Sequence, residues 1–208
     1  TRDIVMQISK EKNEPEWMLE FRLKALEVFE NSKNPNWGPD LSPVDINEIT
    51  TYIRPDAKMS EDWNELPEDI KGTFDALGIP EAEYKRELSG VGAQYDSEVV
   101  YHSLTEKMKN QGVIYTDFET AVREYPDIIK EYFMTCIKPE DHRYAALHYA
   151  VWSGGSFVYV PKGVNVSIPL QSYFRLNAPG AGQFEHTLII IEEGAYCHLI
   201  EGCSEPKY

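Results

Sequence analysis

The chain has 208 residues, of which 42% are hydrophobic and 26% charged, which is enough to bury the core of one large or two small domains. Its formal net charge of −15 argues against nucleic-acid binding, because phosphate recognition requires clustered Lys and Arg side chains. No apolar run approaches the roughly 20 residues that cross a bilayer, and the N-terminus lacks a signal-peptide core, so we expect a cytoplasmic protein without membrane attachment.

The first element is an amphipathic helix in the stretch EPEWMLEFRLKALEVFENS. Trp17, Phe21, Ala25 and Val28 recur at helical spacing, and Met18 and Phe29 widen this apolar face. Pro15 suits the first helical turn. The pattern therefore predicts a helix over Pro15–Asn31.

The next segment is rich in Pro, Asn and Asp, which predicts an ordered connector with one short strand over Ile49–Arg54. Helical stretches are then expected over Glu68–Leu77 and Glu81–Gly90. The sequence SEVVYHSL has the apolar and β-branched content of a strand.

Two further helical segments complete the first part of the chain. DFETAVREYPDIIKEYFMTCI has helical periodicity in two pieces that break at Pro126. HRYAALHYAVWSG predicts a helix that stops before Gly154 and Gly155. Residues 1–156 are thus expected to form a mixed, mainly helical domain.

The pattern changes abruptly after residue 156. Short runs of Val, Ile, Phe and Tyr alternate with the turn signals PKG, APGAG and EEG, which is typical of a sandwich, a barrel or a solenoid of strands. Only five of the 35 acidic residues lie in this part. The charge pattern therefore also separates residues 157–208 from the first part. These strands would need neighbours on both sides, and no sequence remains to supply a further partner for the last one, so we expect an incomplete sheet.

The three cysteines, at irregular spacing, do not form a secreted disulfide framework. Strand alternation places Cys197 and Cys203 on one face and His198 on the other, so a compact metal site within this stretch is not expected. Two interpretations of Cys203 are open: it is a small buried thiol, or it is a thiolate ligand or sulfur acceptor at a strand end. Cys136 and Cys197 have apolar neighbours and are expected to be structural.

The same alternation places Tyr173, Arg175 and Asn177 on one strand face. The five histidines form no HExxH or similar ligand pattern. One alternative is a small β-fold metal-dependent enzyme or ligand-binding module that uses Glu185, His186 and His198; another is an acidic interaction domain without a site.

Four long stretches carry a resemblance to a known family: QGVIYTDFETAVREYPDIIKEYF, HYAVWSGGSFVYVPKGVNVSIPLQSYFRLN, GQFEHTLIIIEEGA and EGCSEP. In these stretches the chain resembles the SufB family, the scaffold subunits of the SUF machinery for iron–sulfur cluster assembly. The resemblance extends over most of the chain from about residue 35 onward.

The resemblance implies an α+β fold in which a mixed domain, residues 1–156, precedes the first turns of a right-handed parallel β-helix, residues 157–208. It implies a non-catalytic scaffold whose partners are a SufC-type ATPase, a SufD-type paralogue and sulfur-donor proteins. The cofactor would be a transient iron–sulfur cluster, and the location the cytoplasm, or the plastid stroma in a eukaryote.

The resemblance also implies roles for single residues. Cys203 matches the cysteine of the family's EGCS motif and would accept sulfur or ligate the metal of the nascent cluster. Arg175 and Asn177 match the YFRxN motif and would line the interior of the β-helix. An inward Arg175 would lower the pKa of a nearby thiol and favour the thiolate.

Members of this family run to more than twice this length. We therefore expect a chain truncated within the β-helix, whose remaining cluster ligands lie elsewhere. A fragment of this kind is not expected to hold a cluster efficiently alone.

Overall fold

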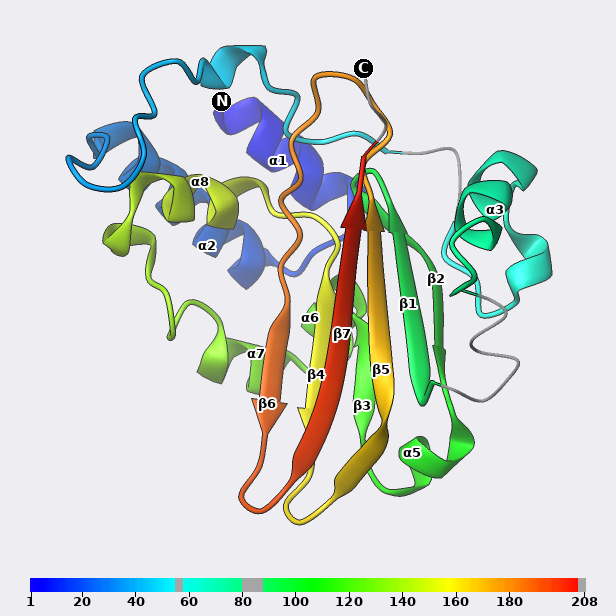
Figure 1. The fold of residues 1–208 in the computed structure, drawn as a ribbon. Helices are drawn as coiled ribbons and strands as arrows, with labels where there is room; N and C mark the ends of the chain where they lie inside the picture. The colour runs from blue at the N-terminus through cyan, green and yellow to red at the C-terminus, as the bar shows by residue number, and fades with distance from the viewer. Residues whose placement is uncertain (55–57, 80–87, 206–208) are drawn as a thin grey trace. The chain divides into compact units, whose positions relative to one another are not determined.

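A computed structural model of the chain describes residues 1–54, 58–79 and 88–205 (Figure 1). The fold is α+β, as predicted, and the chain divides into two compact units. The helical unit comprises Thr1–Tyr52, Glu119–Ser153 and Gly180–Phe184, and the sheet unit comprises the remainder. Within the described ranges, no helix is long and apolar enough to cross a membrane.

The helical unit is built from helices and short 3-10 turns. They are α1 (Arg2–Glu11), α2 (Glu16–Asn31), η1 (Ile46–Glu48), α6 (Phe118–Glu124, from Glu119 onward), α7 (Pro126–Tyr132), η3 (Pro139–Asp141) and α8 (Arg143–Val151). The predicted helices at Pro15–Asn31, on both sides of Pro126, and before Gly154 are confirmed.

The buried face of α2 agrees with the predicted one only in part, at Met18 and Ala25. Met18, Arg22, Ala25 and Leu26 are its buried residues, whereas Trp17 and Phe21 are only half-buried. Hydrophobic periodicity could not identify the centre of this face, because a fully buried arginine, Arg22, occupies it.

Arg22 is held by partners that satisfy its guanidinium group. Its Nε and Nη2 atoms donate to the two carboxylate oxygens of Glu14 at 2.8 and 2.6 Å. It also donates to the backbone oxygens of Ala150 and Trp152, at 3.2 and 2.9 Å, and stacks on the Trp152 ring. These contacts connect α2 to the end of α8 and compensate for desolvation of the charge.

In this part of the chain the sequence missed one helix and predicted one strand that does not form. Helix α1 was not predicted, because its polar sequence contributes only Val5 and Ile8 as buried apolar side chains. The predicted strand at Ile49–Arg54 does not form, and only Thr50 makes an isolated bridge, to Ala181. Backbone pairing there is too short to build a ladder.

The sheet unit contains two sheets. One has the order β2-β1-β5-β7, from β1 (Gly90–Tyr95), β2 (Glu98–Leu104), β5 (Asn165–Arg175) and β7 (Tyr196–Ser204). The other has the order β3-β4-β6, from β3 (Ile114–Asp117), β4 (Ser156–Val160) and β6 (Leu188–Ile191). The unit also holds η2 (Trp63–Glu65), α3 (Glu68–Asp75) and α5 (Glu106–Asn110).

The predicted strand SEVVYHSL forms β2, and α3 accounts for most of the predicted helix Glu68–Leu77. Residues 81–87 of the predicted helix Glu81–Gly90 lie outside the described residues, and Gly90 itself begins β1. The predicted boundary at residue 156 stays a prediction. The two compact units do not follow a single boundary, because each is built from several separate segments of the chain.

Successive strands from β4 onward alternate between the two sheets. β4 pairs with β6 in parallel, and β5 pairs with β7 in parallel. In the second pair Arg175 lies opposite Ser204, 29 residues further along the chain. Strands β6 and β7 consequently run in opposite directions on facing sheets (Figure 1).

Tyr115 of β3 packs between the two sheets. A Cβ atom on Gly90 would lie 2.7 Å from its ring, and one on Gly92 would lie 3.0 Å from its hydroxyl oxygen, so both glycines leave room for this side chain. The hydroxyl donates to the backbone oxygen of Gln171 at 2.7 Å and lies 2.9 Å from Ser172 Oγ. These contacts define which face of β1 and β5 points inward.

The chain enters β4 through two glycines with left-handed backbone angles. Gly155 has φ +96°, and a Cβ atom there would overlap the backbone of His186. Its amide donates to Gln94 Oε1 at 2.9 Å. Both the dihedral angle and the close approach require glycine.

Replacing Gly155 with alanine should destabilise the protein more than the same change at Gly163. Gly163 also has a positive φ, +73°, but open space around it. Gly163→Ala should therefore cost only the backbone penalty of about 1–2 kcal/mol. Gly155→Ala adds a backbone clash, and equal urea-unfolding midpoints for the two variants would contradict this account.

Removing one partner of the buried pair in the helical unit should also be costly. Glu14→Ala leaves the fully buried Arg22 guanidinium without its carboxylate, and we expect a loss of about 3–5 kcal/mol in the free energy of unfolding. The matched control is Glu193→Ala, because the Glu193–Lys162 pair is exposed and should contribute little. Urea denaturation of both variants tests the difference.

Candidate functional site

Cys203 lies one residue before the end of β7 and pairs in register with Phe174 of β5. Leu170 and Ser172 lie on the same β5 face as Phe174, and Ser172 contacts Tyr115 between the sheets. Cys203 therefore belongs to the inner face of its sheet, together with Leu199 and Glu201, and its side chain is exposed there. The predicted alternation along this strand is confirmed.

The segment that leads into β6 supplies a hydroxyl and a carboxyl side chain near this face. Thr187 Oγ1 donates to Glu201 Oε1 at 3.1 Å. Glu185, two residues before Thr187, lies close enough to Cys203 for its negative charge to act on the thiol. Within the described part of the chain, Glu185 Oε2 is buried without a hydrogen-bond partner.

The surroundings of Cys203 favour the neutral thiol. Partial burial, followed by the negative charges of Glu185 and Glu205, raises the pKa of Cys203. Burial also raises the pKa of the Glu185 carboxyl, with a further contribution from Glu201. The site is therefore an acidic one that resists loss of the thiol proton.

Arg175 lies on the other face of β5. It pairs in register with Ser204, and its Nη1 donates to Ser204 Oγ at 3.0 Å. On that face Tyr173, two residues earlier, joins a hydrophobic cluster with Tyr95 of β1. The register therefore separates Arg175 from Cys203, and the charges that act on the thiol are negative.

Asn177 lies beyond the end of β5 and is held through its backbone. Its amide donates to Asp96 Oδ1 at 2.7 Å, and the amide of Ala178 donates to the same oxygen at 3.0 Å. Asp96 adopts φ 51° in the turn between β1 and β2. Sequence reasoning missed Asp96, although an aspartate between two strand-like runs is a typical turn signal.

A buried polar network between the sheets was also missed. Ser156 Oγ lies 2.7 Å from Ser172 Oγ, which in turn contacts the Tyr115 hydroxyl. Burial raises the pKa of Tyr115, so this phenol remains protonated and acts as a hydrogen-bond donor. Only the facing register brings these serines together, and no spacing in the sequence indicates it.

The remaining thiols and histidines do not gather around Cys203. Cys136, expected to be structural, is exposed in the helical unit, while Cys197 is half-buried beside the core of the sheet unit. The His186 ring packs on Phe118 at 4.7 Å, and His198 is exposed. Among the described residues, no group of three or more His, Cys, Asp or Glu side chains could hold a metal ion.

Most of the chain matches a known family of sequences. Residues 7–172 match the family model described as the SufBD protein N-terminal region. The chain belongs to the SufBD family. This match covers most of the helical unit and most strands of the sheet unit.

Similarity to individual proteins also covers the residues outside this match. The iron–sulfur cluster assembly protein SufB of Bacillus subtilis is 53% identical over 208 residues, which are 100% of this chain and 44% of that protein. A SufBD family protein of Staphylococcus haemolyticus is 52% identical with the same coverage. One of Mycobacterium bovis is 54% identical over 200 residues, 96% of this chain and 24% of its own length. The chain thus spans less than half the length of these relatives.

Neutralising Glu185 should make Cys203 more reactive. Glu185→Gln removes a negative charge that raises the pKa of the thiol, so the thiolate fraction at about pH 8 should increase. The rate of alkylation by iodoacetamide, measured by mass spectrometry of the Cys203 peptide, should rise. The control is Glu193→Gln, at an exposed turn, which should leave the rate unchanged. An unchanged or slower rate for Glu185→Gln would show that the charge of Glu185 does not raise the pKa of the Cys203 thiol.

Proposed function

We propose that this chain supplies the N-terminal part of a SufB-type scaffold for iron–sulfur cluster assembly. The observation that carries this proposal is 53% identity to Bacillus subtilis SufB along the whole chain, together with membership of the SufBD family. The scaffold is not itself an enzyme, and ATP hydrolysis belongs to a partner subunit.

Residues 157–208 form the first turns of a right-handed parallel β-helix in this proposal, and residues 1–156 the mixed domain before it. Support comes from strands that alternate between two sheets with parallel pairing. Ile189 and Ile191 are 47% and 40% exposed, although their register partners Val158 and Val160 are fully buried. A further turn of the proposed β-helix would cover these two isoleucine side chains.

Cys203 is the sulfur acceptor or cluster ligand in this scaffold. Its exposed side chain on the inner face is accessible, and the carboxyl groups of Glu185 and Glu201 lie on the same side. Incoming ferrous iron would favour the thiolate, because a divalent cation offsets these negative charges. Iron and sulfide are substrates of the assembly reaction, and the remaining ligands of the cluster come from outside the described residues.

Arg175 and Asn177 support this site indirectly. The resemblance places them on the route of sulfur through the β-helix, and that role stays a prediction. A positional role has closer support: Arg175 contacts Ser204, beside Cys203, and Asp96 anchors the backbone at Asn177. The first contact joins the adjacent ends of β5 and β7, and the second ties the end of β5 to the turn between β1 and β2.

The partners we propose are a SufC-type ATPase, a SufD-type paralogue and sulfur-donor proteins, in the cytoplasm or a plastid stroma. They follow from the family alone. The alternative metal-dependent enzyme gains no support, because the ring of His186 packs on Phe118 and His198 is exposed on the face opposite Cys197 and Cys203.

Anaerobic reconstitution with iron and sulfide tests the role of Cys203. Because this chain alone is not expected to hold a cluster efficiently, we expect only partial binding of iron and sulfide, and Cys203→Ser should lose most of what binds. Cys136→Ser is the matched control, because it removes another exposed thiol in the helical unit and should leave binding intact. Equal iron and sulfide in Cys203→Ser and the parent chain would refute this role.

A further inference from the structure

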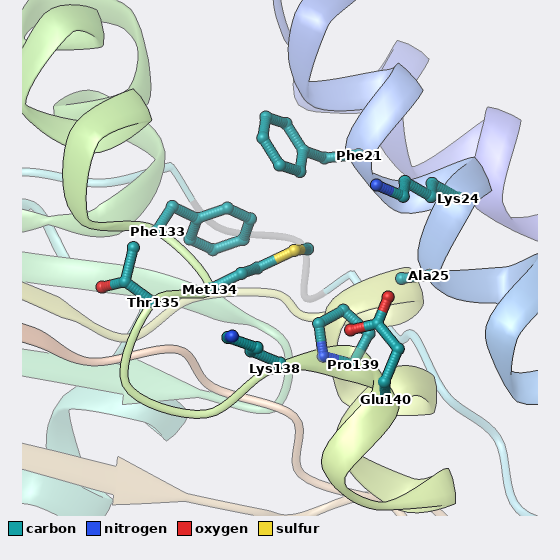
Figure 2. A pocket seen from close by; sticks show the side chains of 9 residues that line it. All are labelled: Phe21, Lys24, Ala25, Phe133, Met134, Thr135, Lys138, Pro139 and Glu140. Atoms are coloured by element: carbon teal, nitrogen blue, oxygen red, sulfur yellow. The ribbon is translucent and has the colours of Figure 1, made fainter.

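The helical unit contains a groove that the cluster chemistry does not use. It lies between α2 and the loop that follows α7, with a volume of about 300 Å³ (Figure 2). Its lining residues are Phe21, Lys24, Ala25, Phe133, Met134, Thr135, Lys138, Pro139 and Glu140. An apolar cavity of about 150 Å³ accepts a benzene-sized group, so this groove has room for more than one large side chain.

The floor of the groove is aromatic and well supported. Phe21 and Phe133 meet edge to face, with ring centroids 5.7 Å apart. Phe133 is almost fully buried and also packs edge to face on Tyr149, at 5.4 Å. This floor is fixed by the core of the helical unit and presents a preformed apolar surface.

Met134 forms part of the wall in an unusual backbone conformation. Its φ of 62° lies in the left-handed region, which is uncommon for a residue without a short polar side chain. Figure 2 shows its thioether extending into the space between Phe133 and the α2 side chains. Strained backbone of this kind occurs at ligand-binding positions, and methionine adapts readily to different apolar partners.

The apolar surface continues along the same loop. Ile137 is 58% exposed and Tyr132 is 37% exposed, on either side of Met134 in the sequence. Both precede Lys138, which lines the groove. Together they give the loop more apolar surface than a solvated connector requires.

Two lysines give the groove its charge. Lys24 extends from α2 and Lys138 from the loop, on different sides of the opening (Figure 2). In the described part of the chain, neither ammonium group forms an ion pair. Glu140 is the single carboxylate in the lining. The opening therefore carries net positive charge on a chain whose formal net charge is −15.

We propose that this groove docks a short segment of a partner protein in which large apolar side chains are flanked by acidic residues. The apolar side chains would occupy the space over Phe21, Phe133 and Met134. The flanking carboxylates would pair with Lys24 and Lys138, whose ammonium groups form no ion pair with any described residue. The inference concerns the helical unit and is independent of the role of Cys203.

The chemistry favours a peptide segment over other anionic partners. Nucleic acids and anionic membranes would meet the large negative charge of the whole chain, and binding them requires many cations rather than two. A short segment meets only the groove. Its apolar anchors account for the aromatic floor, which a phosphate-binding surface does not need.

A labelled peptide series tests this proposal on the full chain. The probe is a fluorescein-labelled peptide with adjacent Trp and Leu flanked on both sides by glutamates. The comparison peptides carry lysines in place of the glutamates, or alanines in place of Trp and Leu. Fluorescence anisotropy should show saturable binding of the acidic peptide, with at least about tenfold weaker binding of both comparison peptides.

Two sets of variants locate the binding. Lys24→Ala with Lys138→Ala should weaken binding of the acidic peptide about tenfold, whereas Lys10→Ala with Lys33→Ala should not change it, although both pairs remove the same charge. Met134→Gly relieves the left-handed backbone while removing the thioether. It should weaken binding without lowering the melting temperature.

The methyl resonance of Met134 provides the direct readout. In protein with ¹³C-labelled methionine methyl groups, the acidic peptide should shift Met134 and leave the buried Met18 and Met108 unchanged. The proposal is overturned if the acidic peptide fails to shift Met134, or if the lysine-flanked peptide shifts it equally. It is also overturned if the Lys10/Lys33 pair matters as much as the Lys24/Lys138 pair.

Discussion

The sheet unit depends on the packing of Tyr115 over the glycines of β1. The ring occupies the space that side chains on Gly90 and Gly92 would fill, and its hydroxyl bonds to the backbone of Gln171 in β5. Two neighbouring strands and one facing strand are thereby fixed in register. Since side chains alternate along a strand, this register determines which residues of β5 and β7 face inward. The inward position of Cys203 follows from it.

The helical unit contains a fully buried charge, the guanidinium group of Arg22. Arg22 has no exposed surface, and Glu14 and two backbone carbonyls together satisfy its donors. Such an arrangement contributes little net stability compared with apolar packing, but loss of one partner is severe. It also fixes the rotation of α2, which determines that Phe21 and Lys24 line the groove.

Charge at the candidate site changes the expected chemistry of Cys203. The resemblance suggested an arginine that would favour the thiolate, whereas the register places Arg175 against Ser204 and leaves carboxyl groups on the thiol's side. A raised thiol pKa keeps the resting side chain neutral. In the scaffold role that we propose, deprotonation would be linked to the arrival of iron, because a bound cation favours the thiolate.

The sequence by itself determined the α+β class, most helices of the first part, and the strands of the last part, because hydrophobic periodicity and proline or glycine signals are local. It also identified the motifs that place the chain in the SufBD family. Only the tertiary structure decided the buried position of Arg22, the network around Tyr115, and the separation of Arg175 from Cys203. Each of these depends on pairing between residues far apart in the chain, and a register shift of one residue would reverse the inward face.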